Sequence, residues 1–226
     1  MDNSSYSSES PASAQSMASK GMLERVSKIV IASTNRGKIT EIQNMDFFKN
    51  FEILTAANVN LGNIEENGDT LEENALLKAR YCYNQTRLPS LADDTGFFIN
   101  ALGGFPGIHC GRLAGASGNR NFNVAAKIIS DKLGDAEDRS CLFATAVAFV
   151  IDGIEFVSRG EMHGKFVYPG RPDNKFDELG YKNYFIPDGI DITCAQADPE
   201  DESFFKHRAT AVRNLIAQIN GQEEAI

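Results

Sequence analysis

Two adjacent carboxylates in the segment LADDTG, residues 91–96, are the groups in this chain best suited to chemistry. Asp93 and Asp94 follow a short apolar run that predicts a strand, and two like charges repel each other unless a cation or a basic group lies close by. Asp and Gly also favour turns, so the segment alone is compatible with a simple turn. With a cation present, one aspartate could hold a metal ion while the same residue or its neighbour orients a water molecule.

A second polar segment, STNRGK at residues 33–38, lies between a predicted strand and a predicted helix. Such a junction offers free backbone N–H groups and the positive end of a helix dipole, which suit a phosphate group. Lys38 adds a full charge, and the side chains before it add hydrogen-bonding groups. The paired glycines of a P-loop are missing, and loops between strands and helices are polar as a rule. By itself, therefore, the segment favours an ordinary polar loop.

Acidic residues are concentrated in IEENGDTLEENA, residues 64–75. An acid-rich first turn is favourable to a helix dipole, which explains the segment without any ligand. Glu65 could instead reach a metal ion if a second carboxylate site lies close by, and LADDTG supplies such a site. Near the end of the chain, FKHR at residues 205–208 contains His207 and Arg208, which could contact a base or a phosphate, or form a solvated basic patch.

The elements that must position these groups follow from hydrophobic periodicity and turn signals. Strands are predicted at 28–33, 51–56 and 90–94, an extended piece with turns at 96–104, and a long hairpin over 140–166 that turns at Asp152 and Gly153. Helices are predicted from Lys38 to Phe48, after Thr70, and over 119–133 and 201–219, with Thr70 and Glu73 as a candidate capping box. The region 168–190 is predicted to be an ordered loop. This order predicts an α/β fold with a mixed sheet.

Composition limits the classes of function. The 226 residues suffice for one large domain or two small lobes, and 42% hydrophobic residues allow a sizeable core. A formal net charge of -9 argues against binding to nucleic acid or to an anionic membrane, although it does not exclude an anionic ligand. The scattered cysteines are typical of buried residues in a reducing compartment. The serine-rich start, residues 1–24, predicts a disordered tail without a secretory signal, and we expect a cytoplasmic protein.

Taken in order, four segments of the chain closely resemble the inosine triphosphate pyrophosphatase family: IASTNRGKITEI, IEENGDTLEENALLKAR, LPSLADDTGFFINALGGFPGIHCGRLAG and KHR. The resemblance is dense from Ile29 to Gly115 and continues more sparsely to Arg208. It implies an elongated, two-lobed α/β fold around a mixed β-sheet with a central nucleotide-binding cleft, spanning residues 25–221 and usually assembled as a homodimer.

The resemblance also implies an activity. Members of this family hydrolyse non-standard purine nucleoside triphosphates, such as ITP, dITP and XTP, to the monophosphate and pyrophosphate. The implied cofactor is Mg²⁺, or Mn²⁺ in its place, because a divalent cation neutralises the phosphate charge while a carboxylate aligns or deprotonates the attacking water. The expected partner is the nucleotide, with neither nucleic acid nor a membrane involved.

The family's functional positions can be carried over residue by residue. Glu65 and Asp94 occupy the metal positions, Asp94 also occupies the general-base position with Asp93 in support, and Lys38 is the catalytic lysine that reaches the triphosphate. The positions expected to bind substrate are Ser33, Thr34, Asn35, Arg36, Gly37, Lys38, Lys78, Thr95, Arg112, Leu179, Gly180, Tyr181, Lys182, His207 and Arg208.

Departures from the family pattern are concentrated where the base would bind. The family has Phe-Gly-Tyr or Phe-Gly-Trp followed by Asp-Pro, whereas this chain has Leu179 at the first position and Lys182 in place of the Asp. The family's late substrate lysine aligns with Glu202, and the Ser of its Ser-His-Arg motif is Lys206. Two alternatives follow: a selectivity altered toward standard or modified nucleotides, or a nucleotide-binding or interaction module with little turnover.

Overall fold

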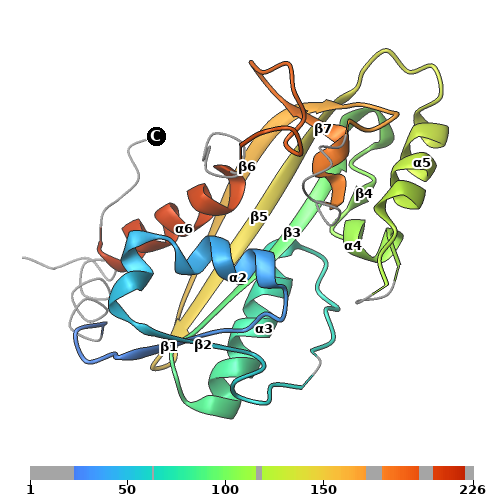
Figure 1. Ribbon diagram of the computed structural model, residues 1–226. Coiled ribbons are helices and arrows are strands. Elements are labelled where there is room, and N and C mark those ends of the chain that lie inside the picture. Colours follow the sequence, from blue (N-terminus) through green and yellow to red (C-terminus); the bar gives the residue numbers. More distant parts are fainter. Residues whose placement is uncertain (1–22, 63, 116–118, 172–179, 199–205, 222–226) are drawn as a thin grey trace, which may run out of the picture.

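The computed structural model describes residues 23–62, 64–115, 119–171, 180–198 and 206–221 (Figure 1). Residues 1–22 of the predicted tail, Leu179 of the expected base-binding segment and Glu202 lie outside the described residues.

A mixed seven-stranded sheet forms the centre of the fold, with the strand order β2-β1-β3-β5-β6-β7 and β4 paired to β3. The strands near the N-terminus, β2, β1 and β3, pair in parallel, and the others pair antiparallel. The prediction of an α/β fold with a mixed sheet is therefore confirmed. The strands are β1 Lys28–Ile31, β2 Glu52–Thr55, β3 Ser90–Ile99, β4 Pro106–Gly107, β5 Ser140–Ile151, β6 Ile154–Phe166 and β7 Phe185–Pro187.

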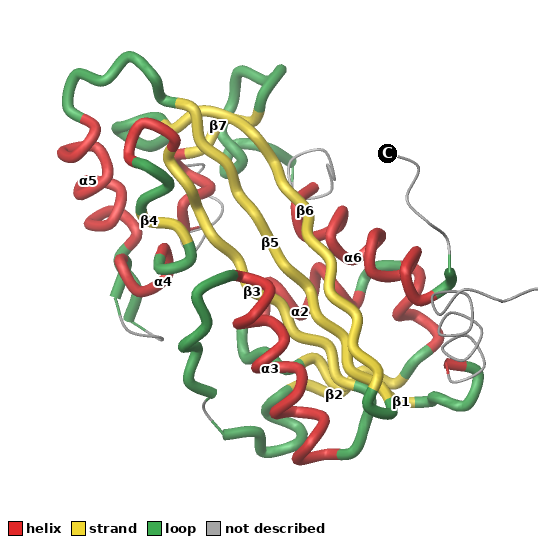
Figure 2. Tube along the Cα trace, turned by 180° about the vertical axis from the view of Figure 1, so that it is seen from behind, coloured by secondary structure: helices red, strands yellow, loops and turns green. Residues whose placement is uncertain are grey.

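Helices cover both faces of the sheet. Figures 1 and 2 show α2 and α6 on one face and α3 on the opposite face, while α5 lies at the far end of the long strands. The α-helices are α2 Arg36–Gln43, α3 Leu71–Thr86, α4 Cys110–Leu113, α5 Phe122–Leu133 and α6 Lys206–Ile219. The 3-10 helices are η1 Asp46–Asn50, η2 Asn100–Leu102 and η3 Gly180–Tyr184. Among the described residues, no helix combines the length and the apolar character needed to span a bilayer.

The core is divided between the two ends of the long strands. At one end, apolar residues of β1, β5 and α6 pack on one face of the sheet, and α3 packs against small residues of β3 and β5 on the other face. At the other end, α5, η3 and β7 pack around Phe97, Phe143 and Phe185. Strands β3, β5 and β6 connect the two ends, which gives the molecule its elongated shape (Figure 1).

Local sequence signals account for several boundaries. Asp152 and Gly153 have φ angles of 47° and 80°, as a two-residue hairpin turn requires, which confirms the predicted turn between β5 and β6. The Thr70 hydroxyl accepts a hydrogen bond from the Glu73 N–H, so the predicted N-cap of α3 is also confirmed. The Glu73 carboxylate returns to the Asp69 N–H, one residue before the position that a capping box would use.

Other boundaries differ from the prediction. The helix expected from Lys38 to Phe48 begins two residues earlier, because Asn35 caps it, and gives way at Asn44 to a turn followed by the 3-10 helix η1. The strand expected at 90–94 continues to Ile99, because β5 pairs with it along its whole length. Part of the loop expected at 168–190 forms η3 and β7, where β7 gains a partner only from β6.

Gly160 allows α6 to lie directly on the sheet. A Cβ atom at this position of β6 would be 2.1 Å from the backbone oxygen of His207 and 2.5 Å from the backbone nitrogen of Ala211. Only a residue without a side chain permits that approach. The contact matters for function because it places the start of α6, with His207 and Arg208, against the central strands.

Candidate active site

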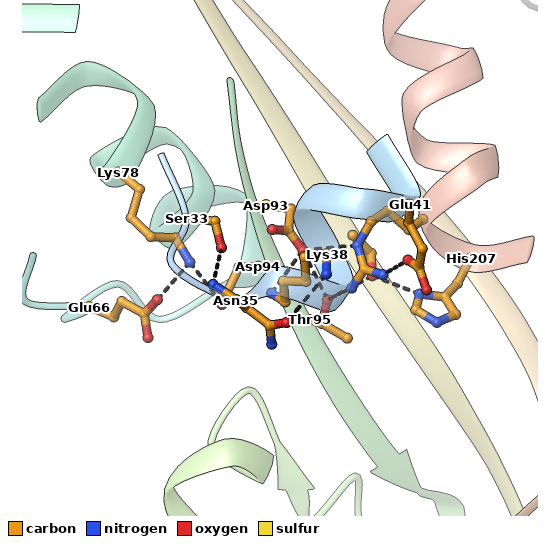
Figure 3. Close-up of polar contacts among 12 residues, drawn as sticks. Ser33, Asn35, Lys38, Glu41, Glu66, Lys78, Asp93, Asp94, Thr95 and His207 are labelled. Carbon is orange, nitrogen blue, oxygen red and sulfur yellow. Dashed lines mark hydrogen bonds and ion pairs between the residues drawn. The ribbon is translucent and has the colours of Figure 1, made fainter. Parts of the chain in front are cut away.

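The loop before α2 uses its own polar side chains to hold its shape. The Asn35 side chain accepts a hydrogen bond from the Lys38 N–H at 3.3 Å, and the Asn35 N–H donates to the Ser33 hydroxyl at 3.2 Å. Thr34, Arg36 and Gly37 are exposed at the helix start, where backbone N–H groups are available to a ligand. The predicted strand–loop–helix arrangement is therefore present (Figure 3).

Asp93 and Asp94 lie inside β3 rather than at its end, which corrects the boundary expected from the sequence. They are nevertheless at an edge of the parallel part of the sheet, because β1 pairs with β3 only at Ser90 and Leu91. Successive side chains of a strand point to opposite faces. Asp93 accordingly meets α2 and α6 on one face, and Asp94 meets α3 on the other (Figure 3). The two charges thus have separate partners.

Asp93 is buried between two cations. Its Oδ2 atom lies 2.8 Å from the Lys38 ammonium and 3.2 Å from Nε of Arg208. Burial alone would raise the pKa of Asp93, but the charges of Lys38, Arg208 and Lys78 outweigh it and hold that pKa well below its usual range. The Oδ1 atom is buried without a hydrogen-bond partner among the described residues. Asp93 is therefore charged at neutral pH, and its ion pair fixes Lys38 at the helix start.

Asp94 belongs to a second cluster, centred on Lys78 of α3. The Lys78 ammonium lies 3.2 Å from Oδ1 of Asp94 and 2.6 Å from Oε1 of Glu66. Burial lowers the pKa of Lys78, but Asp94, Asp93 and Glu66 outweigh it and the pKa is raised. Burial raises the pKa of Asp94, and the lysines offset this only partly. Asp94 is thus a carboxylate with increased basicity, as a general base requires.

Glu66, and not Glu65, is the acidic residue that the structure brings to this cluster. Burial raises the pKa of Glu66, but Lys78 outweighs it and the pKa is lowered, so the side chain is charged. Glu65 is exposed and lies outside the cluster. Arg112 donates to the backbone oxygen of Glu66 and so supports this segment, and a substrate-contacting role for Arg112 stays a prediction. In the sequence, the indication for Glu66 was the pair of adjacent glutamates, Glu65 and Glu66, of which the structure brings one to the site.

Arg208 and His207, at the start of α6, are both buried. Nη2 of Arg208 donates to the Thr95 hydroxyl at 3.2 Å, and Nη1 forms an ion pair with Glu41 of α2. Burial lowers the pKa of Arg208, but Asp93 and Glu41 outweigh it and the pKa is raised. The His207 ring stacks on Phe143 with its centroid 5.4 Å away. Burial, followed by Arg208 and Lys182, lowers the pKa of His207 well below its ordinary value, so the ring is neutral.

Lys182, one of the departures from the family pattern, contacts this cluster through Glu41. The Lys182 ammonium lies 3.5 Å from Oε1 of Glu41, whose other oxygen pairs with Arg208. Burial lowers the pKa of Lys182, and Glu41 offsets this in part. The sequence analysis did not identify Glu41 as a site residue. The one local indication was its position one helical turn after Lys38, on the helix that follows the polar loop.

Two further positions expected to bind substrate lie in the aromatic core beyond this cluster. Gly180 has a φ angle of 61° and lies against the ring of Phe122. Tyr181 is buried, stacks on Phe97 at 4.9 Å and donates its hydroxyl proton to the Cys110 oxygen at 2.9 Å. A substrate-contacting role for Gly180 and Tyr181 stays a prediction.

Comparison with known proteins places this arrangement in a family. The sequence model of the Ham1 family matches residues 29–218. A dITP/XTP pyrophosphatase of Caulobacter vibrioides is 36% identical over 195 residues, covering 85% of this chain and 97% of the relative. A dITP/XTP pyrophosphatase of Rhodospirillum centenum is 38% identical over 194 residues, covering 84% and 93%. The structure of the Staphylococcus aureus Ham1 protein superposes with a TM-score of 0.75 at 30% identity, covering 87% of this chain and 100% of that one. The resemblance seen in the sequence is confirmed, and the chain belongs to the Ham1 family.

Proposed function

We propose that this chain is a metal-dependent pyrophosphatase that hydrolyses non-standard purine nucleoside triphosphates to the monophosphate and pyrophosphate. The observation that carries the proposal is the pair of charge clusters on the two faces of β3, directly beside the start of α2. One cluster fixes a lysine at a helix N-terminus, and the other presents a basic carboxylate. The names of the relatives, dITP/XTP pyrophosphatase, support dITP and XTP as substrates, and we include ITP because it carries the same base as dITP.

The phosphates would lie where the positive groups converge. The start of α2 offers exposed backbone N–H groups at Arg36 and Gly37, and Lys38 is still 21% exposed although it pairs with Asp93. Lys78 adds a second ammonium group, which pairs with Asp94 and, like Lys38, also lowers the pKa of Asp93. Because phosphoryl transfer depends mainly on positioning and on charge stabilisation, these groups supply most of what the chain itself must contribute.

Two carboxylates near Lys78 are of the kind that a divalent cation uses, although the Lys78 ammonium now lies between them. Among the described residues, no group of three or more His, Cys, Asp or Glu side chains that could hold a metal ion is present. Oxygen atoms of Glu66 and Asp94, from two separate segments, approach one ammonium nitrogen at 2.6 and 3.2 Å, so both carboxylates converge on a single cationic position. Mg²⁺ takes oxygen ligands and commonly only one or two protein carboxylates. We propose that Glu66 and Asp94 would hold Mg²⁺, or Mn²⁺ in its place, in preference to the expected pair of Glu65 and Asp94. The ion would offset negative charge on the phosphates.

Asp94 would align the attacking water and accept its proton. Burial raises its pKa above that of an ordinary aspartate, which makes it a better base. The water would attack the α-phosphorus, the bond to the bridging oxygen would break, and pyrophosphate would leave. Asp93 would act indirectly, by holding Lys38 and Arg208 in place.

The proposed reaction is tested by its products. The purified chain with Mg²⁺ and ITP, dITP or XTP should release pyrophosphate and the monophosphate in equal amounts, with rates at least tenfold above those for ATP and GTP. Chelation with EDTA should stop release, and added Mg²⁺ should restore it. Orthophosphate as the product would contradict the reaction, and binding without turnover across all nucleotides would favour a nucleotide-binding module.

The same panel tests a second candidate, a shifted base preference. The observation that favours it is the ion pair of Lys182 with Glu41, which introduces a cation where the family has an acid. Equal or higher rates with standard or modified nucleotides would support this candidate.

We further propose a cytoplasmic homodimer, for which a mass near twice 24.7 kDa in solution would be expected.

Glu66→Gln should separate the two possible acidic ligands. We expect this change to raise the Mg²⁺ concentration for half-maximal activity by at least tenfold, because a neutral amide replaces one of two carboxylates. The matched control is Glu65→Gln, which removes the same charge from the neighbouring, exposed residue and should leave the Mg²⁺ dependence within about twofold. Activity titrated against Mg²⁺ measures both, and the reverse order of effects would restore Glu65 as the ligand.

A further inference from the structure

A chain of hydrogen bonds runs from the buried ring of His207 to the hydroxyl of Thr95, beside the two aspartates. Nδ1 of His207 lies 2.7 Å from Oγ1 of Thr145, and this oxygen lies 2.8 Å from Oγ1 of Thr95. Oγ1 of Thr95 also accepts from Nη2 of Arg208 at 3.2 Å and lies 3.4 Å from Oδ2 of Asp93. Thr145 is completely buried in β5, directly opposite Thr95 in the strand register.

The direction of these hydrogen bonds follows from counting protons. A threonine hydroxyl has one proton to donate and two lone pairs that accept. The Arg208 guanidinium can only donate, so it occupies one lone pair of Thr95. If Thr95 gave its proton to Thr145, its second lone pair would face the ionised carboxylate of Asp93. If Thr95 instead receives the proton of Thr145, its own proton points to Asp93.

The second arrangement gives every group in this series of hydrogen bonds a partner of the right kind. The negative charge of Asp93 attracts the Thr95 proton, whereas it would repel a lone pair. Thr145, having given its proton to Thr95, must accept one from His207. The neutral ring carries a single N–H, which must then be on Nδ1. Thr95 has both lone pairs in use, so it can act toward a ligand only as a donor. It would do so by sharing the proton that it directs to Asp93 across a long contact of 3.4 Å.

We propose that Thr145 is a positioning residue that, together with the Nδ1–H tautomer of His207, fixes the hydroxyl proton of Thr95 on the side of Asp93, where a substrate atom would share it. The group of the substrate that Thr95 meets is accordingly an acceptor oxygen, of a phosphate or of a keto group. This consequence for the substrate rests on the proposed function, since it takes Thr95 as a substrate contact. The assignment of the His207 tautomer does not depend on the proposed function.

The kinetic test compares Thr145→Val with Thr145→Ser. Valine keeps the shape but removes the hydroxyl, so Thr95 loses its fixed direction, and KM for ITP should rise about three- to tenfold, the range for one hydrogen bond, while kcat stays within about twofold. Serine restores the hydroxyl and should restore KM. Thr193→Val is the matched control, because Thr193 is equally buried and donates to the backbone oxygen of Arg171 at 2.7 Å. It should lower thermal stability without raising KM. An unchanged KM in Thr145→Val, or a failure of serine to restore it, would overturn the proposal.

The spectroscopic test reads the tautomer directly. The chain has only three histidines, so ring ¹⁵N signals of His207 can be assigned by comparison with His109→Gln and His163→Gln. The wild-type chain should show a protonated Nδ1 and an unprotonated Nε2 at His207, whereas an Nε2–H tautomer would contradict the proposal even if Thr145→Val failed to fold. Should no nucleotide be hydrolysed, the proposed function would fail while this measurement still decides the direction of the hydrogen bonds.

Discussion

Asp94→Asn is expected to lower kcat for pyrophosphate release from ITP by a thousandfold or more while the chain stays folded. Asparagine has nearly the same size as aspartate but cannot accept the proton of the attacking water. It also removes one of the two carboxylates that approach Lys78. A loss of about 4 kcal/mol in transition-state stabilisation corresponds to a thousandfold decrease in rate. Initial rates of pyrophosphate release at saturating ITP measure the effect.

The control for this variant is Asp131→Asn, which removes an exposed carboxylate that pairs with its own helix neighbour Lys127. It should retain full activity. Activity of Asp94→Asn within tenfold of wild type would rule out Asp94 as the base.

The long elements of this fold are predictable from sequence because their signals are local. Hydrophobic periodicity locates α3 and α5, and the dipeptide Asp152-Gly153 locates the turn of the central hairpin. Short elements are different. The strand β7 and the helix α4 span only 3 and 4 residues, and they depend on partners distant in sequence, so no periodic pattern announces them.

For the candidate site, too, some features are predictable from the sequence and others are not. The polar loop, the adjacent aspartates and the KHR segment are visible in the sequence, but which groups meet is decided by the faces on which they lie. Because strand side chains alternate, Asp93 and Asp94 belong to different clusters although they are neighbours. Glu41 is one of several polar residues in α2, and Thr145 is a threonine in an otherwise mostly apolar strand, so neither stands out in the sequence. They become part of the site only when α6 is placed against β5 and β6.

Asp93→Asn is expected to destabilise the fold more than any other single change in this cluster. Asp93 is 3% exposed and compensates two cations, Lys38 and Arg208, of which the second is also buried. Removing one partner of a buried ion pair leaves uncompensated charge, and we expect the free energy of unfolding to fall by about 3–5 kcal/mol. Urea unfolding at pH 7 measures this. Asp46→Asn, at an exposed pair with Lys49, should cause no measurable change.

The pH dependence shows whether the charge of Asp93 is the cause. Its pKa in the folded chain lies well below the value near 3.9 of an unfolded aspartate, so its stabilisation is fully present above that value and is lost as the pH falls toward the folded pKa. The difference in unfolding free energy between the wild-type chain and Asp93→Asn should therefore be constant from pH 7 to about 5 and should narrow below pH 4, by up to ~1.4 kcal/mol per pH unit. A difference that stayed constant down to pH 3 would mean that the variant is destabilised by altered packing and not by the loss of the ion pairs. Because Asp93 holds Lys38, that outcome would also remove the reason for expecting the lysine to be fixed by charge at the start of α2.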